Sequence, residues 1–208
     1  MTLYVPPHFR VDNREQLLEF VERNAFGTLV SSGAGGLHVS HIPFVVERDA
    51  DGVIRLLGHV ARANPHWQAL EAADHVLAIF NGPHAYVSPT WYQQHPSVPT
   101  WNYAVVHAHG KARLHDEFEL RDLVGRLAAI YEAGRPAPWR IGDQPPDYIA
   151  KMLTAIVGFT LTVEKLEGKF KLSQNRPVEV ERVIAALETE GEGEVAALMR
   201  AHPPARKG

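Results

Sequence analysis

The sequence contains no cysteine among its 208 residues. This absence excludes disulfide bonds and cysteine-based metal or redox chemistry within the chain, and it suits a cytoplasmic location. No uninterrupted apolar run approaches the ~18 residues that a membrane-spanning helix needs. The first ten residues hold two prolines and no apolar core, so no signal peptide is expected. We therefore expect a cytoplasmic protein with no membrane partner.

Positive charge is not in excess either. The 21 lysines and arginines are outnumbered by 24 acidic residues, which gives a formal net charge of −3. Nucleic-acid-binding proteins usually carry a positive excess because they neutralise phosphates, so composition gives little support for a DNA partner. Recognisable nucleotide-binding and hydrolase motifs are also missing. The glycine-rich residues 33–36 are not a dinucleotide-binding motif, because they join two predicted strands and do not precede a helix. No catalytic residue can be named.

The order of predicted elements indicates a mainly β protein with helices, of the α+β class. Strands are predicted over residues 26–32, 37–46, 53–60, 75–80, 103–114, 156–164 and 170–172, with tight turns between several of them. Such short hairpins predict antiparallel pairing, and the helices are too few for a doubly wound sheet. A small antiparallel barrel with peripheral and C-terminal helices fits this order. We expect one domain over residues 1–190, then a short helix and a disordered tail over residues 191–208.

Local signals fix several expected boundaries. Asp12 with Glu15, and Asp116 with Glu119, have the spacing of capping boxes at helix starts. The segment 83–102 is rich in proline and aromatic residues, which predicts a long ordered loop. Residues Glu167-Gly168 predict a turn between two strands.

Twelve histidines raise the question of a metal site. His107 and His109 stand two apart on a predicted strand and so share a face, and His38 lies close to His41. Ordinary surface or hydrogen-bonded histidines are more common than metal ligands at such spacings. No metal site is therefore predicted.

Residues 58–65 predict an anion site or a simple helix cap. The segment GHVARANP leads from a strand end to a helix start, where free N–H groups favour an anion, and Arg62 adds a fork of donors suited to phosphate. The alternative is a capped helix beside a solvated arginine. Pro43 inside a strand indicates an edge, a bulge or the wall of a flat ligand site.

Five blocks together resemble one known family. They are residues 41–44 (HIPF), 58–65 (GHVARANP), 82–86 (GPHAY), 99–103 (PTWNY) and 168–176 (GKFKLSQNR). In order and spacing they resemble the PaiB-type FMN-binding negative transcriptional regulators, over about residues 4–187. That family is related to the pyridoxamine-phosphate oxidase-like split barrels, in which both subunits of a dimer contact FMN. The resemblance implies an antiparallel, FMN-binding split β-barrel that works as a homodimer.

The resemblance also implies roles for ten residues in binding FMN. Arg62, with the backbone near Asn64, would take the FMN phosphate, and His59 would lie near the phosphate or ribityl chain. The strand around His41 and Pro43 would lie along the isoalloxazine ring. The pocket would be closed by residues that in part come from the partner subunit: Asn102, Tyr103, Lys171, Gln174 and Asn175.

Three functions remain open at this point. The family resemblance implies a flavin-binding regulator, and the basic residues Lys165, Lys169, Lys171, Arg176 and Arg182 could face DNA or serve the flavin. An FMN-dependent oxidoreductase acting on a small substrate is the alternative, because flavin supplies its own redox chemistry. Haem binding or degradation is a lower alternative, since related split barrels handle haem and histidine is an axial ligand.

Overall fold

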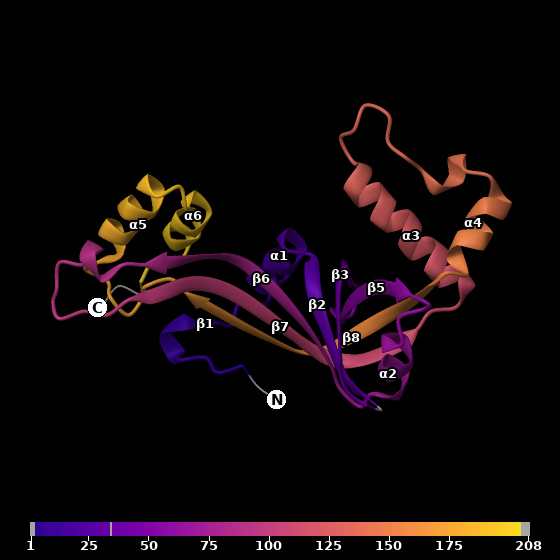
Figure 1. The fold of residues 1–208 in the computed structure, drawn as a ribbon, viewed down its shortest axis with the longest axis horizontal. Helices are drawn as coiled ribbons and strands as arrows, with labels where there is room; N and C mark the ends of the chain where they lie inside the picture. The colour runs from indigo at the N-terminus through magenta and orange to yellow at the C-terminus, as the bar shows by residue number, and fades with distance from the viewer. Residues whose placement is uncertain (1–2, 34, 205–208) are drawn as a thin grey trace. The chain divides into compact units, whose positions relative to one another are not determined.

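The computed structural model describes residues 3–33 and 35–204 and shows an α+β chain, as the sequence predicts (Figure 1). The helices are α1 (Arg14–Arg23), α2 (His66–Ala72), α3 (Glu117–Glu132), α4 (Pro146–Leu153), α5 (Val180–Thr189) and α6 (Gly193–Ala201). The strands are β1 (Arg10–Val11), β2 (Phe26–Gly33), β3 (Gly36–Pro43), β4 (Val45–Arg48), β5 (Ile54–Ala61), β6 (Val76–Val87), β7 (Thr100–Leu114) and β8 (Ile156–Lys171).

These strands form one sheet in the order β3-β2-β6-β7-β8-β5-β4, and β1 pairs with β8. The pairings of β1 with β8, β2 with β3 and β6, β4 with β5, and β5 with β8 are all antiparallel. Strands β3 and β4 end the order, and within the described residues no ladder joins them to close the sheet.

The chain divides into two units by its internal contacts. Unit 1 comprises residues 1–20, 81–106 and 167–208, and unit 2 comprises residues 21–80 and 107–166. Strands β6, β7 and β8 contribute residues to both. The two units are described separately below.

Aromatic packing organises the core of unit 2. The ring of Phe44 lies 5.3 Å from that of Phe80 and 6.2 Å from that of Phe159, in edge-on arrangements that aromatic pairs prefer. Gly58 in β5 lets this core close, because a Cβ there would lie 2.9 Å from the Phe159 ring. All three phenylalanines are buried.

Unit 1 is centred on two aromatic rings and the C-terminal helices. Phe20 lies 4.9 Å from Phe170 between ring centroids, and a Cβ at Gly82 would come within 2.6 Å of the Phe20 ring. Helices α5 and α6 pack against each other (Figure 1). Their buried faces are apolar: Val180, Val183, Ile184, Leu187, Val195, Ala196 and Met199.

Two expected breaks in strands are wrong. Strand β6 continues through Gly82 and Pro83, so the long loop shortens to residues 88–99. Pro83 is tolerated because β6 pairs with β2 only over Val76–Ile79. Strand β8 likewise runs through Gly168 without a turn, because this glycine pairs with Val11 and leaves room for Leu17, which a Cβ would overlap.

The two expected capping boxes have different outcomes. The Asp116–Glu119 box is present in both directions at the start of α3. The Asp12–Glu15 box is wrong, because α1 begins at Arg14 and the Asn13 side chain accepts the Gln16 N–H at 3.1 Å instead. Of the expected disordered tail, residues 205–208 lie outside the described residues.

The described part of the chain contains no helix long and apolar enough to cross a membrane. The same residues contain no group of three or more histidine, aspartate or glutamate side chains that could hold a metal ion.

Candidate functional site

The ten residues assigned to FMN divide evenly between the units. His41, Pro43, His59, Arg62 and Asn64 belong to unit 2. Asn102, Tyr103, Lys171, Gln174 and Asn175 belong to unit 1.

Arg62 of unit 2 is held at both its backbone and its side chain. Its N–H donates to the Ala155 carbonyl at 2.8 Å, and its own carbonyl accepts the Trp67 indole N–H at 3.1 Å. Its guanidinium donates through Nε to the Thr154 carbonyl at 2.7 Å and through Nη2 to the Ile156 carbonyl at 3.2 Å. The group is exposed and its Nη1 has no partner among the described residues, so a fixed positive fork keeps donors for an anion.

Asn64 fixes the segment that carries Arg62. Its Oδ1 accepts the His66 N–H at 3.0 Å, and its Nδ2 donates to Ser40 Oγ in β3 at 3.0 Å. The N-cap of α2 is Pro65, so the expected cap at Asn64 is off by one residue, although Asn64 still binds the N–H of the first helical residue. The amide is therefore occupied by the chain's own groups, and any phosphate contact near it falls to the backbone.

The buried ring of His66 completes this network. Its Nδ1 lies 2.8 Å from Ser40 Oγ and its Nε2 lies 3.1 Å from Ser31 Oγ. Ser40 accepts from Asn64, which leaves its O–H to donate to Nδ1 and favours the neutral ring with its proton on Nε2. Burial, and then the charge of His38, lower the pKa of His66 to about 4.

A cavity of about 680 Å³ opens beside Arg62. This volume lies in the range of cofactor and small-molecule pockets, roughly 300–1,000 Å³. Its walls combine Arg62 and Lys151 with the apolar side chains of Leu120, Leu153 and Ile156. Asp116 and Glu117 also line it, and the Asp116 carboxylate is engaged in capping α3.

His115 also lines this cavity. Its Nε2 lies 2.7 Å from Thr160 Oγ1, whereas the buried Nδ1 has no hydrogen-bond partner. Burial lowers the pKa of His115 despite the opposing charge of Glu119, which favours the neutral ring. The two cations and the apolar walls fit an anionic cofactor with an apolar ring system, such as FMN.

The other four predicted residues of unit 2 do not line this cavity. His59 lies in β5 with its buried Nδ1 unpartnered, and burial lowers the pKa of its ring. His41 and Pro43 lie on the exposed face of the β2–β3 hairpin, where His41 Nδ1 is 3.0 Å from Thr28 Oγ1. Asn64 contacts Ser40 on the opposite, buried face of β3. The structure therefore does not bring His41 and Pro43 together with Asn64.

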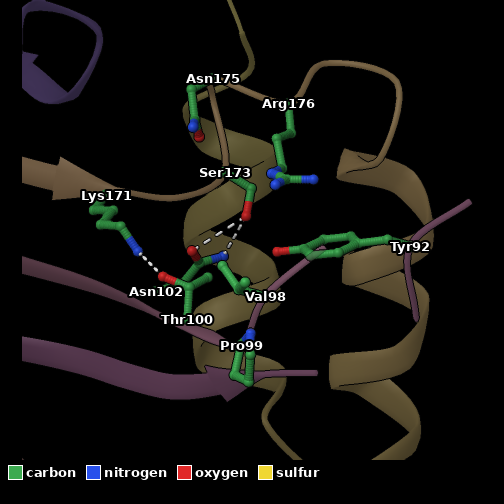
Figure 2. A pocket seen from close by; sticks show the side chains of 9 residues that line it. All are labelled: Tyr92, Val98, Pro99, Thr100, Asn102, Lys171, Ser173, Asn175 and Arg176. Atoms are coloured by element: carbon green, nitrogen blue, oxygen red, sulfur yellow. Dashed lines mark hydrogen bonds between the residues drawn. The ribbon is translucent and has the colours of Figure 1, made fainter. Parts of the chain in front are cut away.

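Unit 1 brings three of its five predicted residues to a smaller cavity (Figure 2). Asn102, Lys171 and Asn175 line a space of about 180 Å³ together with Ser173 and Arg176. Asn102 and Ser173 are both buried and exchange hydrogen bonds at 3.0 and 3.2 Å. Lys171 donates to Thr100 Oγ1 and to the Trp101 carbonyl.

Tyr103 and Gln174 do not line this cavity. The Tyr103 ring lies 5.3 Å from Lys169 Nζ. Gln174 closes its own loop, because its Oε1 accepts the Leu172 N–H and its Nε2 donates to the Phe170 carbonyl, both at 2.7 Å. Its side chain is thus committed to shaping the end of β8.

The sequence interpretation missed Lys151, His115 and Ser173. Lys151 and His115 stand alone in their segments, and only folding places them in the cavity of Arg62. Ser173 has a signal that appears only in the backbone, a φ of 66°, which is rare for a residue other than glycine.

The antiparallel sheet with its inserted helices has the fold of the flavin-binding split-barrel proteins. Solved structures confirm this fold. The flavocytochrome Anf3 from Azotobacter vinelandii aligns with a TM-score of 0.59 at 17% identity, over 80% of this chain and 72% of that one. An FAD- and haem-binding protein from Mycobacterium smegmatis aligns with a TM-score of 0.58 at 17% identity, over 78% and 73% of the two chains.

The chain belongs to the PaiB-type FMN-binding family. Residues 3–165 match the family described as "Putative FMN-binding domain". The Bacillus subtilis (strain 168) protein "Protease synthase and sporulation protein PAI 2" is 38% identical over 174 residues, which cover 84% of this chain and 83% of that protein. FMN is therefore the cofactor, and the predictions of family, fold and cofactor are confirmed.

Proposed function

We propose that this protein is a homodimeric, FMN-binding negative transcriptional regulator in which Arg62 and Lys151 hold the FMN phosphate. The observation that carries the flavin site is the guanidinium of Arg62, fixed by two backbone carbonyls beside a cavity of about 680 Å³. A donor that is already immobilised loses little entropy when an anion binds. FMN supplies redox chemistry when bound, and Arg62, Lys151 and His115 supply binding and orientation.

The proposed dimer rests on an exposed apolar face of unit 2. Phe26, Leu37 and Val39 share the outer face of the β2–β3 hairpin with His41 and Pro43, and they are 67%, 68% and 54% exposed. Grouped apolar side chains of this kind mark an interface or a ligand surface. We propose that this face meets the partner subunit and the flavin ring, so that each flavin contacts both subunits.

The phosphate role is tested by comparing FMN with riboflavin, which lacks the phosphate. In the wild type we expect FMN to bind much more tightly than riboflavin. Arg62→Ala should weaken FMN binding about tenfold or more, because a charged hydrogen bond contributes ~1.5–3 kcal/mol, and should leave riboflavin affinity nearly unchanged. Arg121→Ala removes another exposed arginine of unit 2 and serves as the control. An FMN affinity within about twofold of wild type in Arg62→Ala would refute the role.

The dimer is tested by sedimentation. We expect a mass of twice the 23.1 kDa of one chain, and dissociation in Val39→Lys, because a charge cannot be buried unpaired at an apolar interface. Ile130→Lys, on the exposed side of α3, should not dissociate the dimer. A wild-type mass of one chain at working concentration would contradict the proposal.

The regulatory role is supported by the relationship to the PAI 2 protein and is tested with DNA. The basic side chains near the end of β8 are largely engaged: Lys169 lies over two tyrosine rings, Arg176 lies over Tyr92, and Arg182 donates to the Trp91 carbonyl. We therefore expect binding to the gene's own upstream DNA with a shallow salt dependence, because few phosphates are neutralised. The absence of binding in both flavin redox states, together with FMN-dependent oxidation of NAD(P)H, would favour the oxidoreductase instead.

A further inference from the structure

Unit 1 contains two neighbouring ammonium groups without a compensating carboxylate. Lys169 is only 9% exposed and lies 5.3 Å from the ring centroids of Tyr4 and Tyr103. Lys171 is half-buried, and neither lysine forms an ion pair within the described residues. Burial, and then the charge of Lys169, lower the pKa of Lys171. Like charges at low solvent access are costly, so this arrangement favours an anion nearby.

The cavity that Lys171 lines has a second cation in its wall (Figure 2). Arg176 lines it as well, positioned by a hydrogen bond to Ser97 Oγ at 3.1 Å and by the Tyr92 ring 4.7 Å from its Cζ. No carboxylate is among the lining residues. The nearby Glu179 is turned to the backbone, where it accepts the N–H groups of Gln93 and Gln94 at 2.9 Å. Lys171 and Arg176 are thus both held in position in the wall of this cavity.

The wall of this cavity also stores backbone strain. Ser173 has a φ of 66°, a conformation that costs about 1–3 kcal/mol outside glycine and that clusters at ligand sites. Its hydroxyl is tied to Asn102, which has no exposed surface. The strained residue and the buried amide hold the polar wall beside Lys171 in one position.

We propose that this cavity is a binding site for a small oxyanion, either a carboxylate or inorganic phosphate, which is separate from the flavin. The volume of about 180 Å³ suits an acid of a few carbon atoms and lies below the roughly 300 Å³ at which cofactor pockets begin. Lys171 and Arg176 bind the charge. The site also lies partly outside the FMN-binding domain match, which ends at residue 165.

The test measures the thermal midpoint of the full-length protein saturated with FMN, while sodium acetate, succinate or phosphate is added at constant ionic strength made up with chloride. A ligand of the native state raises Tm in a saturable manner. We expect at least one of these probes to stabilise the wild type beyond chloride. The probe that binds most tightly distinguishes a carboxylate ligand from phosphate.

Two variants separate binding from folding. Lys171→Met should weaken probe binding about tenfold or more. In chloride alone it should remain folded, because removal of the repulsion between the lysines offsets the loss of the bonds to Thr100 and Trp101. Arg176→Gln should weaken binding similarly and gives a second reading if one variant folds poorly. Lys111→Met, an exposed lysine on β7, is the control and should bind as wild type does.

Three results would overturn the proposal. The first is no saturable stabilisation by any probe beyond chloride. The second is unchanged probe affinity in both Lys171→Met and Arg176→Gln. The third is competition with FMN, in which the probe binds only flavin-free protein and Lys171→Met weakens the binding of FMN but not of riboflavin. The cavity would then hold the flavin phosphate. None of these results depends on the fate of the Arg62 proposal, which Arg62→Ala tests separately.

Discussion

The buried His66 should make the protein sensitive to mild acid. In the folded chain its pKa is lowered from 6.5 to about 4, first by burial and then by the charge of His38. The unfolded chain therefore takes up a proton on this ring at a higher pH than the folded chain does. The part of the unfolding free energy that depends on a neutral His66 is present above about pH 6.5. It is lost as the pH falls towards about 4.

The size of the effect follows from the shift. His66 is 1% exposed, so solvent screening of its environment is small. The whole shift corresponds to about 3 kcal/mol of unfolding free energy, of which about 2 kcal/mol is lost between pH 7 and pH 5. Because Ser40 links His66 to Asn64, this loss should loosen the segment that carries Arg62.

Urea unfolding at pH 7 and pH 5 measures this loss directly. The wild type should lose about 2 kcal/mol more over this interval than His66→Gln, which cannot titrate. His8→Gln changes an exposed histidine and should keep the wild-type dependence. A His66→Gln variant that loses as much stability as the wild type between pH 7 and pH 5 would refute the assignment.

Two further predictions concern packing and backbone strain. Gly110→Ala should destabilise the protein by about 1–3 kcal/mol or more, since the new Cβ would overlap the Thr162 carbonyl. Gly142→Ala, in open space, should stay within about 0.5 kcal/mol of wild type. Equal urea midpoints for the two variants would contradict this prediction. Ser173→Ala should cost about 1 kcal/mol more than Ser173→Gly, because both lose the bond to Asn102 but only glycine relieves the positive φ. Unfolding free energies in urea decide the order of the two variants.

Much of the fold could be predicted from the sequence because alternating apolar residues and turn signals are local. The Asp116–Glu119 box specifies the start of α3 as expected, whereas the N-cap of α2 falls on Pro65, one residue after the expected Asn64. Gly82 and Gly168 could not be interpreted correctly, because their role is to let Phe20 and Leu17 approach the strands. A glycine that permits a long-range contact looks the same in sequence as a glycine in a turn.

The candidate site was predictable in part for the same reason. Arg62 and Asn64 stand in one continuous segment, whose pattern predicts an anion site or a helix cap. Lys151 and His115 join Arg62 only through folding of distant segments. The commitment of Gln174 to its own loop, and the occupation of the Asn64 amide, are hydrogen-bonding outcomes that residue type alone does not reveal.

The most direct test of the central claim is a titration of the flavin-free protein with FMN, followed by the flavin absorbance bands and compared with riboflavin. The account predicts saturable binding of FMN with one flavin per chain, and a markedly lower affinity for riboflavin because the phosphate contacts are missing. No saturable binding of FMN, or equal affinity for the two flavins, would contradict it.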